Sequence, residues 1–76
     1  MDVTKLVRMA NQIAENLDYG PNKERVVADT ADHLRRFWSP PMKQLIVEHY
    51  RSGDTELSPL ASRAVARLAA EQQNVA

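Results

Sequence analysis

Two histidines are the residues of this sequence best suited to metal binding or acid–base catalysis. His33 and His49 stand sixteen positions apart, and neither belongs to an HExxH motif or to another paired-histidine pattern of metal sites. A single histidine on an expected helix is typically a surface or partly buried side chain. The histidines therefore predict no metal site.

The four serines are the candidate nucleophiles, but their positions favour a structural role. Ser39 and Ser58 each precede a proline, the pattern of a helix N-cap followed by the first helical residue. Ser52 and Ser62 also lie near expected helix ends. The two glycines are isolated, so no glycine-rich phosphate loop is present. We interpret the chain as a poor enzyme candidate, with no catalytic residues.

The segment RRFWSPPMK, residues 35–43, holds the only Trp and the only Phe of the chain beside two arginines. Arginine stacks on aromatic rings and binds carboxylates, and Trp and Arg often dominate interface energies. The alternative to a contact surface is that Phe37 and Trp38 pack in the core at a helix boundary. Adjacent helical side chains point about 100° apart, so we expect one ring inside and one facing a partner. The pattern leaves open whether Phe37 or Trp38 is the exposed ring.

Size and charge limit the possible functions. A chain of 76 residues forms one small domain with a modest core. Because the chain has no Cys, disulfides cannot stabilise it, and we expect a protein partner to supply the additional stability. The formal net charge of zero disfavours a general nucleic-acid binder. The N-terminal residues contain no uncharged apolar run, which predicts no membrane association and a cytoplasmic protein.

Apolar residues recur at helical spacing in four segments, which predicts an all-α fold. The expected helices cover about Thr4–Leu17, the residues after Asn22 as far as Trp38, Pro40–Arg51 and a segment from Pro59 onward. We expect a single domain over residues 1–76, either a compact or a partly splayed bundle, with a frayed tail at 71–76. The expected apolar stripes are Leu6, Met9, Ala10, Ile13, Ala14 and Leu17; Val27, Ala31, Leu34 and Trp38; Met42, Leu45 and Ile46; and Leu60, Ala64, Val65 and Leu68.

Three blocks of the sequence together resemble the delta subunit of NAD-dependent, molybdenum-containing formate dehydrogenases. In that family an acidic residue commonly follows the Trp, and a basic residue stands between Pro and Met. This chain has Ser39 and Pro41 at those two positions. The blocks are KLVRMANQIA at residues 5–14; Ala31, His33, Arg36, Phe37, Trp38, Pro40 and Met42; and Leu57, Pro59 and Leu60 with the helix 64–68 that follows.

The resemblance implies a non-catalytic accessory subunit that binds the catalytic (alpha) subunit and supports its assembly, stability or cofactor maturation. It implies no cofactor on this chain. The bis-molybdopterin guanine dinucleotide, the iron–sulfur clusters, FMN and NAD would belong to the partner complex. We expect the partner to contact a polar patch of the first helix and the aromatic corner, namely Arg8, Asn11, Gln12, Arg36, Phe37, Trp38 and Met42.

Two other functions compete with this one. A stand-alone helical adaptor could self-associate through the Phe37 and Trp38 patch, so a homodimer of the isolated chain is possible. A helix-turn-helix DNA binder would use Arg35, Arg36 and Lys43, but the neutral charge weighs against it. The sequence leaves open the stoichiometry, the docking surface and whether the subunit remains in the mature complex.

Overall fold

The computed structural model describes residues 2–53 and 56–73, and these residues form four α-helices. They are α1 (Val3–Leu17), α2 (Lys23–Phe37), α3 (Pro40–Arg51) and α4 (Pro59–Gln73). The described residues contain no strand, so the prediction of an all-α fold is confirmed. Within these same residues, no helix is both long and apolar enough to cross a membrane.

Each helix begins at a side chain that accepts a hydrogen bond from a backbone N–H of the first turn, which satisfies one of the unpaired donors there. Pro40 and Pro59 are the first residues of α3 and α4, where a missing N–H costs nothing. The predicted caps before both prolines are thus confirmed. The four acceptors are Asp2 (from Thr4, 2.9 Å), Asn22 (from Arg25, 3.3 Å), Ser39 (from Met42, 3.5 Å) and Ser58 (from Ala61, 3.3 Å).

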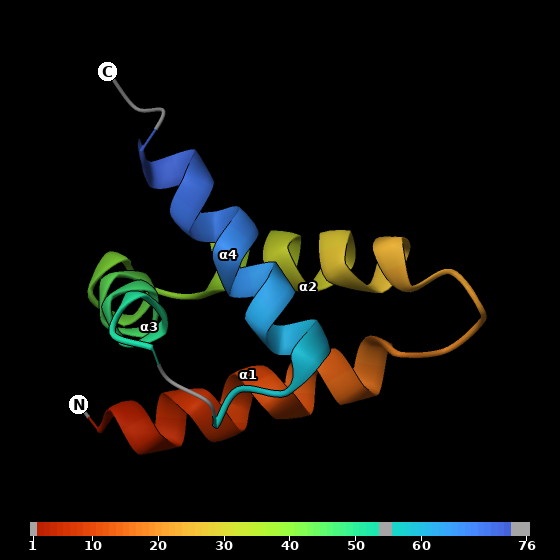
Figure 1. Ribbon diagram of the computed structural model, residues 1–76, viewed down its shortest axis with the longest axis horizontal. Helices are drawn as coiled ribbons and strands as arrows, with labels where there is room; N and C mark the ends of the chain where they lie inside the picture. Colours follow the sequence, from red (N-terminus) through yellow and green to blue (C-terminus); the bar gives the residue numbers. More distant parts are fainter. Residues whose placement is uncertain (1, 54–55, 74–76) are drawn as a thin grey trace.

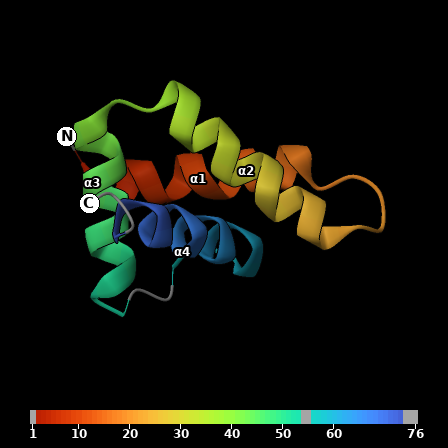
Figure 2. The same cartoon turned by 90° about the horizontal axis from the view of Figure 1, so that it is seen from above.

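The four helices pack as a hairpin with two crossing helices. α1 and α2 run in opposite directions and are joined by a loop at residues 18–22, where Gly20 has φ = 88°. α3 is seen end-on in Figure 1, and α4 crosses the α1–α2 hairpin; Figure 2 shows α3 across one end of the other helices. The radius of gyration, 11.4 Å, equals the value of about 11.4 Å expected for a compact domain of this length. The bundle is therefore compact and not splayed.

The core is built where α4 meets the other three helices, and it corrects part of the predicted stripes. Met9 is 43% exposed, and Leu60, Met42 and Leu45 are only partly buried. Val7 and Val47, which the stripes omitted, are 3% and 1% exposed. The difference arises because each helix has more than one neighbour, which widens its buried face. The largest cluster of buried side chains contains Leu6, Val7, Ala10, Ala14, Leu34, Trp38, Ile46, Val47, Leu57, Ala61, Val65, Leu68 and Ala69.

The predicted frayed tail differs from the structure at its start, because α4 continues to Gln73. The Arg35 Nη2 atom of α2 donates a 2.5 Å hydrogen bond to Oε1 of Glu71, which joins the last turns of α4 to α2. Residues 74–76 lie outside the described part of the chain. The contact thus joins residues 36 positions apart in sequence.

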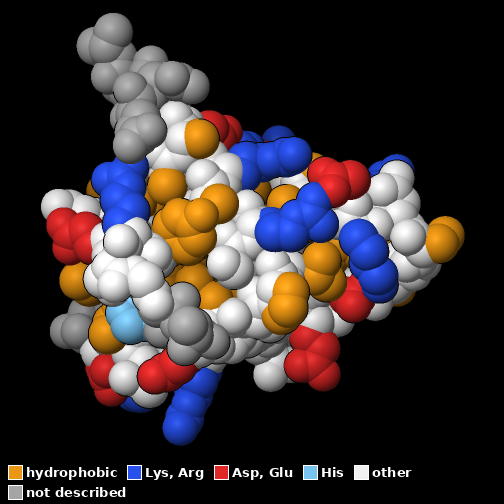
Figure 3. Space-filling view, viewed as in Figure 1, with side chains coloured by type: hydrophobic (Ala, Val, Ile, Leu, Met, Phe, Trp, Pro, Cys, Tyr) orange, Lys and Arg blue, Asp and Glu red, His pale blue; other side chains and the backbone are white. Residues whose placement is uncertain are grey.

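Charged side chains of both signs connect α2 to α4 on the side of the molecule shown in Figure 3. Arg63 of α4 pairs with Glu24 of α2, and Arg35 bridges Glu71 and Asp32. The hydrogen bond to Glu71 raises the pKa of Arg35 above its ordinary value, against a smaller opposite effect of burial. These half-exposed pairs add little stability individually, but they give Arg35 and Arg63 carboxylate partners within the chain.

Candidate docking site

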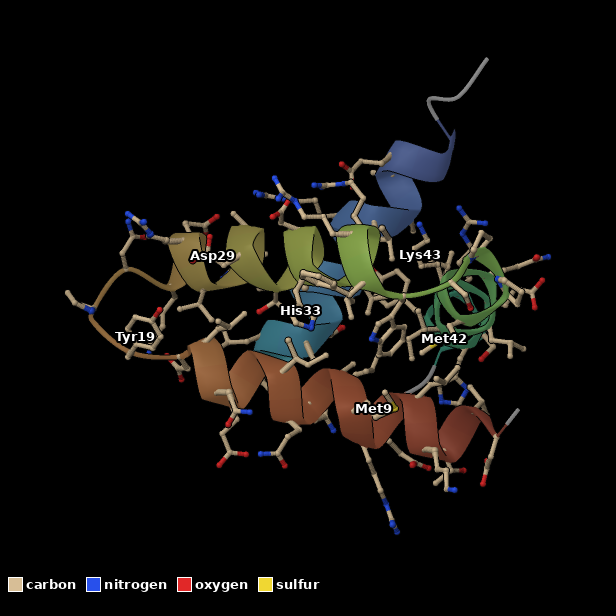
Figure 4. The ribbon with its side chains drawn as sticks, turned by 180° about the vertical axis from the view of Figure 1, so that it is seen from behind. Met9, Tyr19, Asp29, His33, Met42 and Lys43 are labelled. Carbon is tan, nitrogen blue, oxygen red and sulfur yellow. The ribbon has the colours of Figure 1, made fainter. Side chains whose placement is uncertain are left out.

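An open apolar groove of about 580 Å³ lies between α1, α2 and the start of α3. Figure 4 shows its side of the molecule, with Met9 on α1, His33 on α2 and Met42 at α3. The groove contains mostly apolar side chains with a few polar ones. Its lining residues are Arg8, Met9, Gln12, Ile13, His33, Phe37, Trp38 and Met42.

The two adjacent rings of the aromatic corner are buried to very different extents. Trp38 is 5% exposed, belongs to the main core cluster and forms the floor of the groove. Phe37 is 71% exposed and stands at the rim. The expectation of one internal ring and one exposed ring is confirmed, and the exposed ring is Phe37. That Phe37 contacts a partner remains a prediction.

The exposed Phe37 ring is held in place by a neighbour on the same helix. Its centroid lies 4.8 Å from that of His33, with the two ring planes tilted by 48°. His33 is one turn earlier on α2, and the contact restricts the rotation of both side chains. The contact favours one orientation of the Phe37 ring in the free chain, and any rotamer freedom restricted before binding lowers the entropy cost of binding.

The charge at the groove mouth is positive. Arg8 is exposed on α1, and within residues 2–53 and 56–73 no carboxylate pairs with it. Gln12 is also exposed and donates to Oδ1 of Asn16 at 3.4 Å. No acidic side chain lines the groove among these residues. The groove thus presents apolar area beside a guanidinium with unused hydrogen-bond donors.

Asn11 lies outside the groove and is engaged within the chain. Its Nδ2 atom donates to the backbone oxygen of Glu56 at 3.0 Å, and its Oδ1 atom accepts from the N–H of Ser58 at 2.8 Å. These two bonds fix the start of α4 onto α1. Sequence analysis placed Asn11 among the expected partner contacts; the structure gives its side chain a task inside the fold, and a contact with a partner remains a prediction.

Replacing Asn11 with alanine should lower the free energy of unfolding by about 2 kcal/mol, since two hydrogen bonds to backbone groups are lost at roughly 1 kcal/mol each. Urea denaturation followed by circular dichroism measures the change. Asn16→Ala is the matched control because Asn16 is exposed on the same helix, and its effect should stay within about 0.5 kcal/mol. Equal stability of the two variants would contradict the bracing role of Asn11.

Arg36 also lies outside the groove. Its Nε atom is 3.1 Å from Oδ2 of Asp32, four positions earlier on α2, in the favourable order of an acid followed by a base. Lys43 donates to the backbone oxygen of Arg35 at 3.2 Å. The three cations proposed for a DNA-binding interpretation, Arg35, Arg36 and Lys43, thus all have partners inside the chain, which weighs against that alternative.

Of the seven predicted partner residues, the groove brings together five: Arg8, Gln12, Phe37, Trp38 and Met42. The sequence did not single out Met9, Ile13 or His33 for this surface. Met9 and Ile13 had been assigned to the core stripe of the first helix, and His33 had been interpreted as an isolated side chain. Met9 and Ile13 are four positions apart and directly follow Arg8 and Gln12, and His33 is four positions before Phe37, so the i,i+4 spacing was the available signal.

Potential metal ligands are dispersed. Among the described residues, no group of three or more His, Asp or Glu side chains is arranged to hold a metal ion. The fold and the site together define a small all-α protein whose most distinctive surface is an open apolar groove.

The chain belongs to the NADH-dependent formate dehydrogenase delta subunit family FdsD, whose family model matches residues 5–65. The match confirms the resemblance seen in the three sequence blocks. It spans every residue that lines the groove as well as Asn11 and its bonding partners. No curated protein and no solved structure matches the chain.

Proposed function

We propose that this chain is an accessory subunit that docks onto the catalytic subunit of a formate dehydrogenase complex and supports its assembly, stability or cofactor maturation. The observation that carries the proposal is the groove, with Phe37 71% exposed at its rim, in a chain of the delta subunit family. Exposed apolar patches rimmed by polar residues mark interaction sites. The molybdenum cofactor, iron–sulfur clusters and flavin of the complex would then be held by its other subunits.

A test combines the purified chain with the purified catalytic subunit and follows complex formation by size-exclusion chromatography with light scattering. We expect a stable complex. In a second arm, the catalytic subunit is expressed with and without this chain, and its yield and molybdenum content per polypeptide are measured. We expect both to be lower without the chain. Absence of a complex together with unchanged yield and molybdenum content would contradict the proposal.

Self-association through the same patch is the second candidate, because the exposed Phe37 ring could insert into the groove of another copy. A symmetric dimer places the same surface on both sides of the interface. Each copy would then bring an Arg8 to the shared interface, and no acidic side chain lines the groove among the described residues to pair with it. The unpaired cations disfavour the dimer, and light scattering of the isolated chain measures self-association directly.

A further inference from the structure

The shape of the groove restricts the kind of protein segment that fits it. α1 contributes two i,i+4 pairs, Arg8 with Gln12 and Met9 with Ile13, and α2 contributes His33 with Phe37. The α1 lining therefore follows the helix axis for about 7.5 Å, at 1.5 Å per residue. A groove between two helical ridges is the form that receives the apolar face of a third helix.

Backbone hydrogen bonding favours a helix over an extended segment as the occupant. An extended segment in an apolar groove must find partners for its N–H and C=O groups, and none of the described residues forms a strand edge that could supply them. A helix satisfies its own backbone groups. The exposed polar side chains of the lining, such as Arg8 and Gln12, remain available for the polar side chains of a bound helix.

Charge indicates which polar side chain the occupant carries. Arg8 has no carboxylate partner within the described residues, and no acidic side chain lines the groove there. The guanidinium binds carboxylates by paired, charge-assisted hydrogen bonds. A complementary segment therefore presents Asp or Glu to Arg8 and apolar side chains to Trp38 and Met42.

We propose that the groove receives an amphipathic helix of the formate dehydrogenase catalytic subunit, with apolar side chains against Met9, Phe37 and Trp38 and a carboxylate paired with Arg8. This rests on the proposed function and deepens it, since it assigns the surface and the chemistry of the partner segment. The same charge complementarity speeds association and makes it dependent on salt.

Charge reversal at Arg8 tests the ion pair. Arg8→Glu should raise the Kd for the purified catalytic subunit about tenfold, mainly through slower association, with a smaller dependence on salt than the wild-type chain. Arg67→Glu is the matched control: Arg67 is exposed on α4, lies outside the groove and undergoes the same change in charge. Its Kd should remain at the wild-type value. Circular dichroism of both variants checks that the fold is intact.

Photo-crosslinking identifies the occupant. A photoreactive methionine analogue at Met9 and Met42 leaves the groove nearly unaltered, because both residues already line it. We expect mass spectrometry to find crosslinks from both positions to one segment of the catalytic subunit. That segment should have apolar residues at spacings of three and four and an Asp or Glu among them.

The outcomes distinguish a failure of the proposed function from a failure of the groove assignment. Failure of the wild-type chain to bind the catalytic subunit, with the yield and molybdenum content of that subunit unchanged, contradicts the proposed function itself. A wild-type complex in which Arg8→Glu binds like Arg67→Glu, or in which the crosslinked segment lacks acidic residues, overturns only the groove assignment. Crosslinks to a second copy of this chain also overturn it, in favour of the dimer.

Discussion

Replacing Phe37 with alanine should weaken binding to the catalytic subunit by about 2–4 kcal/mol, a roughly 30- to 1000-fold rise in Kd. The side chain is 71% exposed, so its removal costs the isolated fold little. In the proposed complex we expect it to be a buried aromatic anchor at the rim of the groove, and in the free chain its ring contacts that of His33. Phe37→Ala should therefore lower the affinity for the catalytic subunit and leave the stability of the isolated chain nearly unchanged.

Isothermal titration calorimetry with the purified catalytic subunit measures the affinity, and urea denaturation measures the stability. Tyr19 provides the matched control: it is 75% exposed and lies on the α1–α2 loop, outside the groove. Tyr19→Ala should bind like the wild-type chain. An unchanged Kd for Phe37→Ala, or an equal loss for both variants, would contradict the docking role of the groove.

Replacing the neighbouring Trp38 with alanine should act on the fold. Large-to-small changes of this kind cost about 3–5 kcal/mol in a core, and Trp38 is 5% exposed in the main cluster with Leu34 and Ile46. A domain of 76 residues has a total stability of about 4–11 kcal/mol. The variant should therefore lose a large part of this stability, and its unfolding temperature should fall by about 12–40 °C.

The measurement is thermal unfolding followed by circular dichroism at 222 nm. Trp38→Phe is the conservative control, because it keeps an apolar ring in the core and should lose only about 1–2 kcal/mol. A cooperative transition of Trp38→Ala at the wild-type temperature would show that the ring is dispensable for the core. Comparison with Phe37→Ala then distinguishes the expected core role of Trp38 from the expected binding role of Phe37, its neighbour in the sequence.

The fold followed from the sequence where the signal was local. Ser39 with Pro40 and Ser58 with Pro59 predicted the starts of two helices, and both lie where expected. The reason is physical: an N-cap and a proline act within one turn of the chain, so their effect depends on no distant residue. The family could also be recognised from the sequence, because the residues that resemble it form short contiguous stretches of the chain.

Features that depend on distant contacts were not accessible from the sequence. The two backbone partners of Asn11 lie 45 and 47 positions away, and no periodicity relates them. Met9 shares the helical spacing of Leu6 and Ala10, yet it faces the groove because no helix covers that side of α1. Which ring of the aromatic corner is buried depends on the same arrangement of neighbours.

The central position of α4 has a consequence for biosynthesis. It packs against all three other helices and supplies Ala61, Val65, Leu68 and Ala69 to the main core, but the ribosome makes it after them. At a synthesis rate of about 5–20 residues per second, residues 52–73 take roughly 1–4 s. During this interval the inner faces of α1, α2 and α3 lack their cover, while helical domains fold in microseconds to milliseconds. We therefore expect translation to limit the maturation of this chain, with the main core complete only after α4 has emerged.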